Sequence, residues 1–149
     1  MFIYRIIYMH EWSELFLLSL SAFLAATILP AQSEIVLLGM VMTEQYNKWL
    51  LVTVATLGNV LGAIVNWFLG CYLMRFQGSK WFPISRRNVN KAMNFYHKYG
   101  AWTLLFSWVP VIGDPLTLVA GIFRINLLLF IVLVSIGKCI RYLGIVIIV

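Results

Sequence analysis

The chain of 149 residues is 62% hydrophobic and only 11% charged. This composition excludes a soluble globular domain of the same size and predicts an integral membrane protein. The net charge of +6 does not indicate nucleic acid, because six of the eleven basic residues lie in one acid-free segment, residues 75–98, between apolar stretches. A basic loop of this kind is typical of the cytoplasmic side of a membrane. We therefore expect a single membrane domain over residues 1–149, with loop 75–98 in the cytoplasm.

The first apolar stretch, residues 15–29, would form a helix about 22 Å long, which is shorter than a bilayer core of about 30 Å. Pro30 interrupts it, and a polar group that ends at Glu34 follows. A second short apolar run covers residues 35–42. This pattern predicts two half-length helices that meet at a polar break, although the segment from 15 to 42 is also compatible with a full crossing.

Residues 50–74 form the first stretch that is long enough to cross the membrane. Asn59 and Asn66 are its strongly polar residues and are candidates for a polar path. Gly58 and Gly62 form a GxxxG pair, which favours close packing of helices.

The second half begins with another interrupted segment. Runs 101–109 and 116–123 would be about 14 and 12 Å long as helices, each near half a bilayer. The break between them contains Pro110, Gly113 and Pro115. Two prolines so close together make an unbroken helix improbable.

The last apolar stretch, residues 127–149, is long enough to cross once and carries two basic residues. Lys138 would lie about 17 Å into this helix, and Arg141 would share its face. A cation at that depth costs several kcal/mol unless it faces the bundle interior or water. Glu34 and Asp114 are the acids at comparable depth, so we expect ion pairs between these four residues.

The two halves of the chain each place an acid four residues after a proline. Pro30 stands four residues before Glu34, and Pro110 stands four residues before Asp114. A glycine followed by a polar residue then comes 24 residues after the first acid and 23 after the second, as Gly58–Asn59 and Gly137–Lys138. We interpret this as an inverted repeat of about 13–74 and about 99–149; chance similarity between two apolar segments is the alternative. Inverted repeats with discontinuous helices are typical of secondary transporters.

The four charged residues have a functional and a structural interpretation. In the functional one, Glu34 or Asp114 exchanges a proton while Lys138 and Arg141 attract an anionic group such as a phosphate. In the structural one, the ion pairs only lock the repeats together. Because a buried ion pair stabilises less than apolar packing would, we favour function.

Several motifs resemble the DedA family, also called the SNARE-associated or VTT-domain family, and especially its small YqaA-like branch. The resemblance covers about residues 15–145. It rests on residues 29–39, on Gly58–Asn59 with Gly62, on 107–114 followed by Ala120–Gly121, and on Gly137–Lys138 with Arg141–Tyr142.

This resemblance implies a bacterial inner-membrane protein with two re-entrant helices in an inverted repeat. It also implies a role in membrane homeostasis that depends on the proton-motive force, and in some members translocation of a polyprenyl phosphate carrier lipid. Glu34 matches the membrane-embedded acid of the family. Many members carry an Arg close before the proline of the second re-entrant motif, where this chain has Ser107 and Trp108, and a second Arg shortly after it, where this chain has Asp114. Carrier-lipid transport is therefore an extrapolation for this branch.

We therefore expect a transporter or lipid translocase whose partners are membrane lipids, an anionic carrier lipid among them, and protons. An enzyme is not expected, because His10 and His97 lie outside the apolar stretches and the sequence contains no metal-ligand cluster and no nucleophile with a neighbouring base. We also expect no cofactor. A scaffold or assembly factor is the alternative, since GxxxG pairs mediate association and a chain this small is a candidate homo-oligomer.

Overall fold

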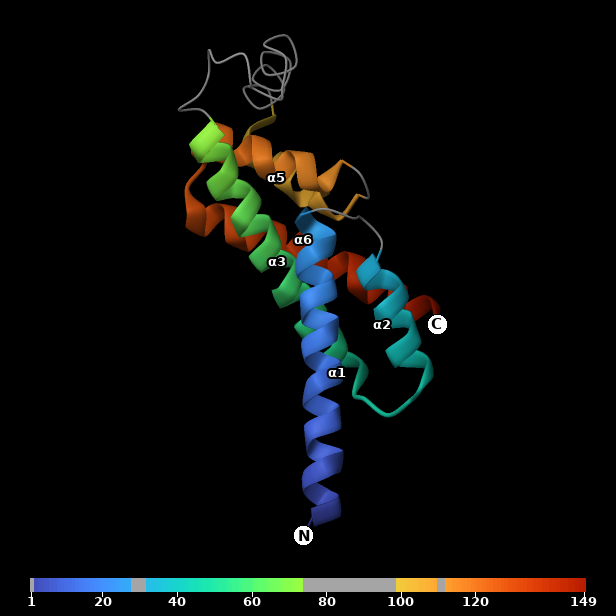
Figure 1. Cartoon of the computed structure of the whole chain (residues 1–149). Coiled ribbons are helices and arrows are strands. Elements are labelled where there is room, and N and C mark those ends of the chain that lie inside the picture. Colours follow the sequence, from blue (N-terminus) through green and yellow to red (C-terminus); the bar gives the residue numbers. More distant parts are fainter. Residues whose placement is uncertain (1, 28–31, 74–98, 110–111) are drawn as a thin grey trace.

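The computed structural model describes residues 2–27, 32–73, 99–109 and 112–149; of residues 2–11 and 27 it describes the backbone alone. Within these ranges all regular structure is helical, as predicted (Figure 1). The elements are α1 (Phe2–Thr27), α2 (Gln32–Met42), α3 (Lys48–Leu73), the 3-10 helix η2 (Gly100–Trp108), α5 (Gly113–Ile122) and α6 (Leu127–Ile148).

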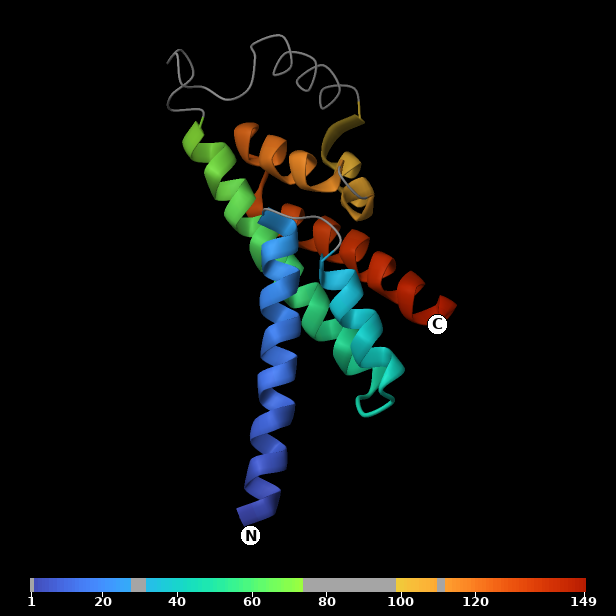
Figure 2. The same cartoon turned by 45° about the vertical axis from the view of Figure 1, so that its right-hand side comes forward.

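The two long apolar helices, α3 and α6, contact each other and run in roughly opposite directions (Figures 1 and 2). They contain 26 and 22 residues, and both are long and apolar enough to cross a membrane. They correspond to the predicted stretches 50–74 and 127–149, which confirms the two expected spans by length and composition.

The predicted length of the first helix was wrong. Instead of a half-length helix over 15–29, α1 begins at Phe2, contains 26 residues and ends at Thr27. Its N-terminal half extends away from the other helices (Figures 1 and 2). Arg5, Glu11 and Glu14 interrupt the apolar pattern before residue 15, but arginine and glutamate are good helix formers, so the helix continues through them.

The helices that follow the two polar breaks begin earlier in the chain than expected. Because α2 begins at Gln32 and α5 at Gly113, Glu34 and Asp114 lie in the first turns of these helices and not in the breaks before them. Pro115 is the third residue of α5, a position where its missing N–H leaves no intrahelical bond unmade. Pro30, Pro110 and loop 75–98 lie outside the described residues.

Glycines bring the helix backbones into close contact. A Cβ atom on Gly58 would lie 2.3 Å from the carbonyl oxygen of Ser19 in α1, and one on Gly62 would lie 2.6 Å from that of Phe23. The GxxxG pair therefore packs α3 against α1 of the same chain. Between α3 and α5, Gly70 and Gly121 play the same role, with Cβ positions 2.1 Å from Leu118 O and 1.9 Å from Trp67 O.

The apolar core consists of two clusters. One joins α1, α2 and α3 with the C-terminal half of α6, and includes Leu18, Leu37, Leu51 and Val146. The other joins η2 and α5 with the C-terminal half of α3 and the N-terminal half of α6, and includes Leu104, Ala120 and Phe130. Buried polar side chains on α2, α3, η2, α5 and α6 complete the interior.

Candidate functional site

Lys138 is the most deeply buried charged side chain in the part of the chain that the structure describes, with 1% of its surface exposed. Its Nζ donates a hydrogen bond to Oδ1 of Asp114 at 2.9 Å, and the two residues form an ion pair. Asp114 lies in the first turn of α5, where the positive end of the helix dipole favours a carboxylate. The side chain of Asp114 is 21% exposed, so the acid is the more accessible partner of the pair.

The second ion pair joins Arg141 of α6 to Glu34 of α2. The Nε of Arg141 donates to Oε1 of Glu34 at 2.6 Å, and its Nη2 contacts the same oxygen. Both side chains are more exposed than Lys138, at 11% for Arg141 and 26% for Glu34. This pair connects the two halves of the chain, whereas Lys138 and Asp114 both belong to the second half. The expected ion pairing is therefore confirmed.

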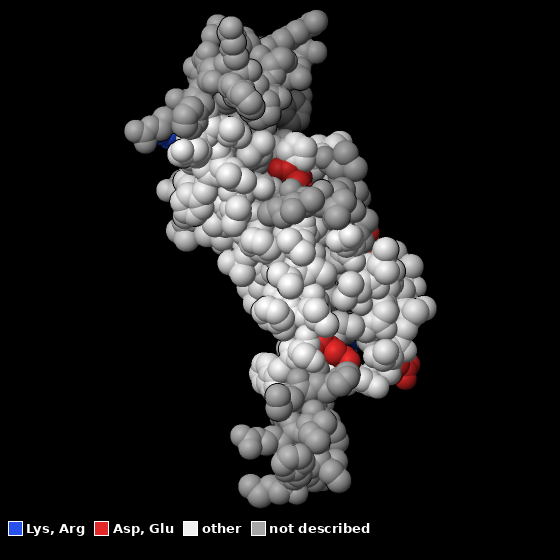
Figure 3. Space-filling view, in the orientation of Figure 1, with Lys and Arg blue, Asp and Glu red and all other residues white. Residues whose placement is uncertain are grey.

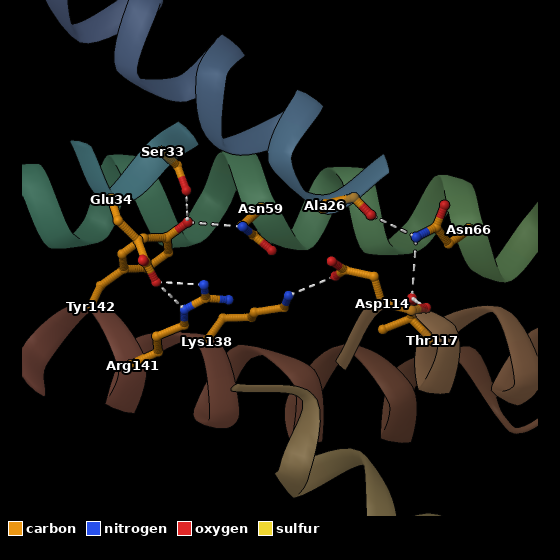
Figure 4. A network of polar contacts seen from close by, with 10 residues as sticks. All are labelled: Ala26, Ser33, Glu34, Asn59, Asn66, Asp114, Thr117, Lys138, Arg141 and Tyr142. Carbon is orange, nitrogen blue, oxygen red and sulfur yellow. Dashed lines mark hydrogen bonds and ion pairs between the residues drawn. The ribbon is translucent and has the colours of Figure 1, made fainter. Parts of the chain in front are cut away.

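Tyr142 links the two halves through hydrogen bonds between uncharged groups. Its hydroxyl lies 2.9 Å from Oγ of Ser33 and accepts a hydrogen bond from Nδ2 of Asn59 at 2.8 Å. All three residues are buried. Figure 4 shows Tyr142, Arg141 and Lys138 extending from α6 toward α2, α3 and α5, so that one face of α6 carries the polar contacts.

Asn66 makes a separate contact at the other end of the network. Its Nδ2 donates to the carbonyl oxygen of Ala26 at 2.8 Å and to Oγ1 of Thr117 at 3.3 Å (Figure 4). Thr117 in turn donates to the backbone carbonyl of Asp114 at 2.7 Å. Asn66 thus connects α1, α3 and α5, next to the helix turn that holds the acidic partner of Lys138.

Two buried polar atoms near the network have no hydrogen-bond partner among the described residues, namely Oγ of Ser107 and Oδ1 of Asn59. Ser107 is packed tightly, because a Cβ on Gly113 would lie 2.1 Å from its carbonyl oxygen and one on Gly137 would lie 2.7 Å from its Oγ. Such unpaired groups are uncommon among buried polar atoms in proteins.

A pocket of about 370 Å³ opens beside the second ion pair. Its lining consists of Glu34 and Arg141 together with apolar residues, namely Trp108, Ile140, Gly144, Ile145 and Ile148. A larger groove of about 460 Å³ lies between α3 and α6, but its lining residues are apolar or weakly polar and include no charged side chain. On the face drawn in Figure 3, most of the surface of the described residues is uncharged.

The structure brings together Glu34, Asp114, Lys138, Arg141 and Asn59, and it places Asn66 at the edge of the same network. Ser33, Thr117 and Tyr142 were not among the predicted site residues. Tyr142 had a signal in the sequence, because it follows Lys138 by four residues and so shares its helix face. Ser33 and Thr117 had none beyond their proximity to Glu34 and Asp114.

Comparison with known proteins confirms the resemblance given by the motifs. Residues 29–149 match the VTT domain. The chain is 41% identical over 137 residues to "Inner membrane protein YqaA" of Escherichia coli, covering 92% of each chain. It is also 25% identical over 129 residues to "Undecaprenyl phosphate transporter A" of Staphylococcus aureus, covering 80% of this chain and 63% of that protein. No solved structure is significantly similar to it.

Proposed function

This chain belongs to the VTT-domain family of inner-membrane proteins, also called the DedA family, and we propose that it is a transporter or lipid translocase that supports membrane homeostasis. It moves an anionic lipid or another anion, with coupling to protons. One observation carries the proposal: two cations and two carboxylates pair in the interior beside the two apolar spanning helices. Ionisable groups at membrane depth mark transport pathways by default. The Staphylococcus aureus relative, named as a transporter, supports transport over catalysis.

The same proposal includes an inverted repeat with two re-entrant hairpins, α1–α2 and η2–α5, each followed by a spanning helix. Two features support it. Glu34 and Asp114 occupy the first turns of α2 and α5. In addition, Gly58 of α3 contacts the backbone of α1, and Gly137 of α6 contacts the backbone of η2 at the carbonyl of Leu105. Each spanning helix thus packs a glycine against the first segment of its own hairpin.

The four charged residues take different roles in this proposal. Lys138 and Arg141 attract the anionic group, whereas Glu34 and Asp114 exchange protons. Each carboxylate holds one cation in the resting state, so protonation of the carboxylate frees that cation for the anion. Asn59 and Asn66, both buried on α3, line the polar path, and Asn66 lies at the end of the path where Thr117 bonds to Asp114.

The test is lipid movement between leaflets in reconstituted vesicles. Purified protein is inserted into vesicles that contain a fluorescent phosphatidate, and chemical quenching of the outer leaflet measures flux across a pH series. We expect wild type to move the lipid with a rate that depends on pH, and Lys138→Ala and Asp114→Asn to lose that flux. Glu34→Gln should flatten the pH dependence; equal rates for Glu34→Gln and wild type across the series would remove the proton role from Glu34.

Glu44→Gln is the matched control for these variants. Glu44 is an exposed acid in the turn between α2 and α3, outside the polar network, so its replacement should leave both the rate and the pH profile unchanged. Absence of flux in wild type, with the protein folded, would contradict the proposed function and favour a scaffold. The scaffold reading has less support than the sequence suggested, because Gly58 and Gly62 already pack against α1 of the same chain.

A further inference from the structure

Two contacts, one charged and one neutral, join the first turn of α2 to α6. Glu34 pairs with Arg141, and the residues next to them in the chain, Ser33 and Tyr142, share a hydrogen bond of 2.9 Å. Asn59 of α3 donates to the same Tyr142 hydroxyl at 2.8 Å, so the neutral contact also reaches a third helix. Figure 4 shows the charged and the neutral contact side by side.

The two contacts differ in burial and in chemistry. Ser33 and Asn59 are 2% exposed and Tyr142 is 1% exposed, whereas the side chains of Arg141 and Glu34 are 11% and 26% exposed. Hydroxyl and amide groups keep their charge near neutral pH, but a carboxylate can take up a proton. A buried hydrogen bond is also costly to leave unmade. The neutral contact therefore persists under conditions that open the ion pair.

Arg141 has room to move when the pair opens. The pocket of about 370 Å³ beside it is lined by Glu34 and by Gly144, one helical turn further along α6. A Cβ atom on Gly144 would meet no atom within 4 Å, so this part of the pocket is open. A guanidinium on a flexible side chain can enter such a space by a rotamer change alone. Lys138 does not line the pocket and is 1% exposed.

We propose that Ser33, Asn59 and Tyr142 form a neutral clamp, which holds α2 against α6 when Arg141 leaves Glu34. Opening of the ion pair then moves the Arg141 side chain and leaves the helices in place. Side chains change rotamer on a shorter timescale than helices move, so the pair can open and close without rearrangement of the fold. The inference rests on the proposed function for the event that opens the pair, and it makes Tyr142 a positioning residue of that step.

The test measures the distance between α2 and α6 after each contact is removed. Ile35→Cys on α2 and Ile147→Cys on α6 carry spin labels; these positions are 71% and 80% exposed, so the labels do not disturb buried packing. Cys71→Ser and Cys139→Ser remove the free thiols and complete the parent protein. Electron paramagnetic resonance in nanodiscs then gives the mean distance between the labels and its spread.

Glu34→Gln removes the charge of the ion pair, and Tyr142→Phe removes the central hydroxyl of the neutral clamp. We expect each single variant to keep the distance distribution of the parent, because the other contact remains. Glu34→Gln/Tyr142→Phe should give a longer mean distance and a broader distribution. A loss of stability alone would not produce this pattern, because the single variant Tyr142→Phe also loses the hydrogen bonds.

Tyr46→Phe is the matched control for the loss of a hydroxyl. The hydroxyl of Tyr46 donates to Glu14 of α1 at 2.6 Å and lies outside the neutral clamp. Glu34→Gln/Tyr46→Phe should therefore keep the distribution of the parent. If Glu34→Gln/Tyr142→Phe does not fold, Glu34→Gln/Ser33→Ala removes the same hydrogen bond from the α2 side.

A longer distance in Glu34→Gln alone would overturn the proposal, because the ion pair would then be the contact that holds α2. A parent-like distribution in both double variants would overturn it as well and assign this role to the apolar packing of α2. Flux in the vesicle assay separates the neutral clamp from the proposed function. The expected distances without flux in wild type keep the clamp and remove transport, whereas wild-type flux with parent-like double variants removes the clamp and keeps transport.

Discussion

Removal of Asp114 should destabilise the protein more than removal of its partner. Asp114→Asn leaves the ammonium of Lys138 buried at 1% exposure without a counter-ion, which should cost about 3–5 kcal/mol of the free energy of unfolding. Lys138→Met leaves a carboxylate that is 21% exposed at a helix N-terminus, where the partial exposure and the helix dipole offset part of the loss. We expect a cost of about 1–3 kcal/mol for this variant.

The double variant Asp114→Asn/Lys138→Met makes the comparison decisive. With both charges gone, no buried ion remains unpaired, so the double variant should lose less stability than Asp114→Asn alone. The measurement is reversible unfolding in mixed detergent micelles, with increasing SDS and helical circular dichroism as the signal. Glu44→Gln, an exposed acid, should change the free energy of unfolding by no more than about 0.5 kcal/mol. Additive losses in the double variant would refute the reasoning, because they would mean that Lys138 and Asp114 do not depend on each other.

Three further predictions concern two contacts between helices and one helix cap, and they use the same unfolding assay. Tyr142→Phe removes the hydroxyl that Ser33 and Asn59 share, so it should cost about 1–3 kcal/mol, and an unchanged midpoint would argue against that contact. Gly58→Ala should destabilise the protein by about 1–3 kcal/mol, because its Cβ would lie 2.3 Å from a backbone oxygen of α1. Gly39→Ala, where the Cβ meets open space, should stabilise it by up to about 1 kcal/mol. A change of the same sign in both variants would contradict this reasoning. Asn126→Ala should cost about 1 kcal/mol of stability, because the Asn126 side chain accepts hydrogen bonds from the backbone N–H groups of Leu128 and Leu129 at the start of α6. Full stability in this variant would show that the cap is dispensable.

The features that the sequence predicted well are those governed by one helix at a time. The two spans follow from the length of an apolar run, and Lys138 and Arg141 share a face because they are three residues apart. The ion pairs followed from a strong physical constraint, since a buried cation needs a partner and the chain has few acids at that depth.

The features that could not be predicted depend on several helices together. The hydroxyl of Tyr142 meets Ser33 and Asn59, which are 109 and 83 residues away in the chain, and no local pattern specifies such a meeting. Which acid pairs with which cation depends on how α2 and α5 pack against α6, and this packing brings Glu34 to Arg141 and Asp114 to Lys138. Hydropathy also misplaced the start of α1, because Arg5, Glu11 and Glu14 interrupt the apolar run there but not the helix.

The pairing between Glu34 and Arg141 has a consequence for the synthesis of the protein. Glu34 leaves the ribosome 107 residues before its partner, which corresponds to about 5–20 s at a translation rate of roughly 5–20 residues per second. During that interval the carboxylate of Glu34 has no counter-ion from α6. The contacts of α2 with Arg141 and Tyr142 can therefore form only after α6 has been made.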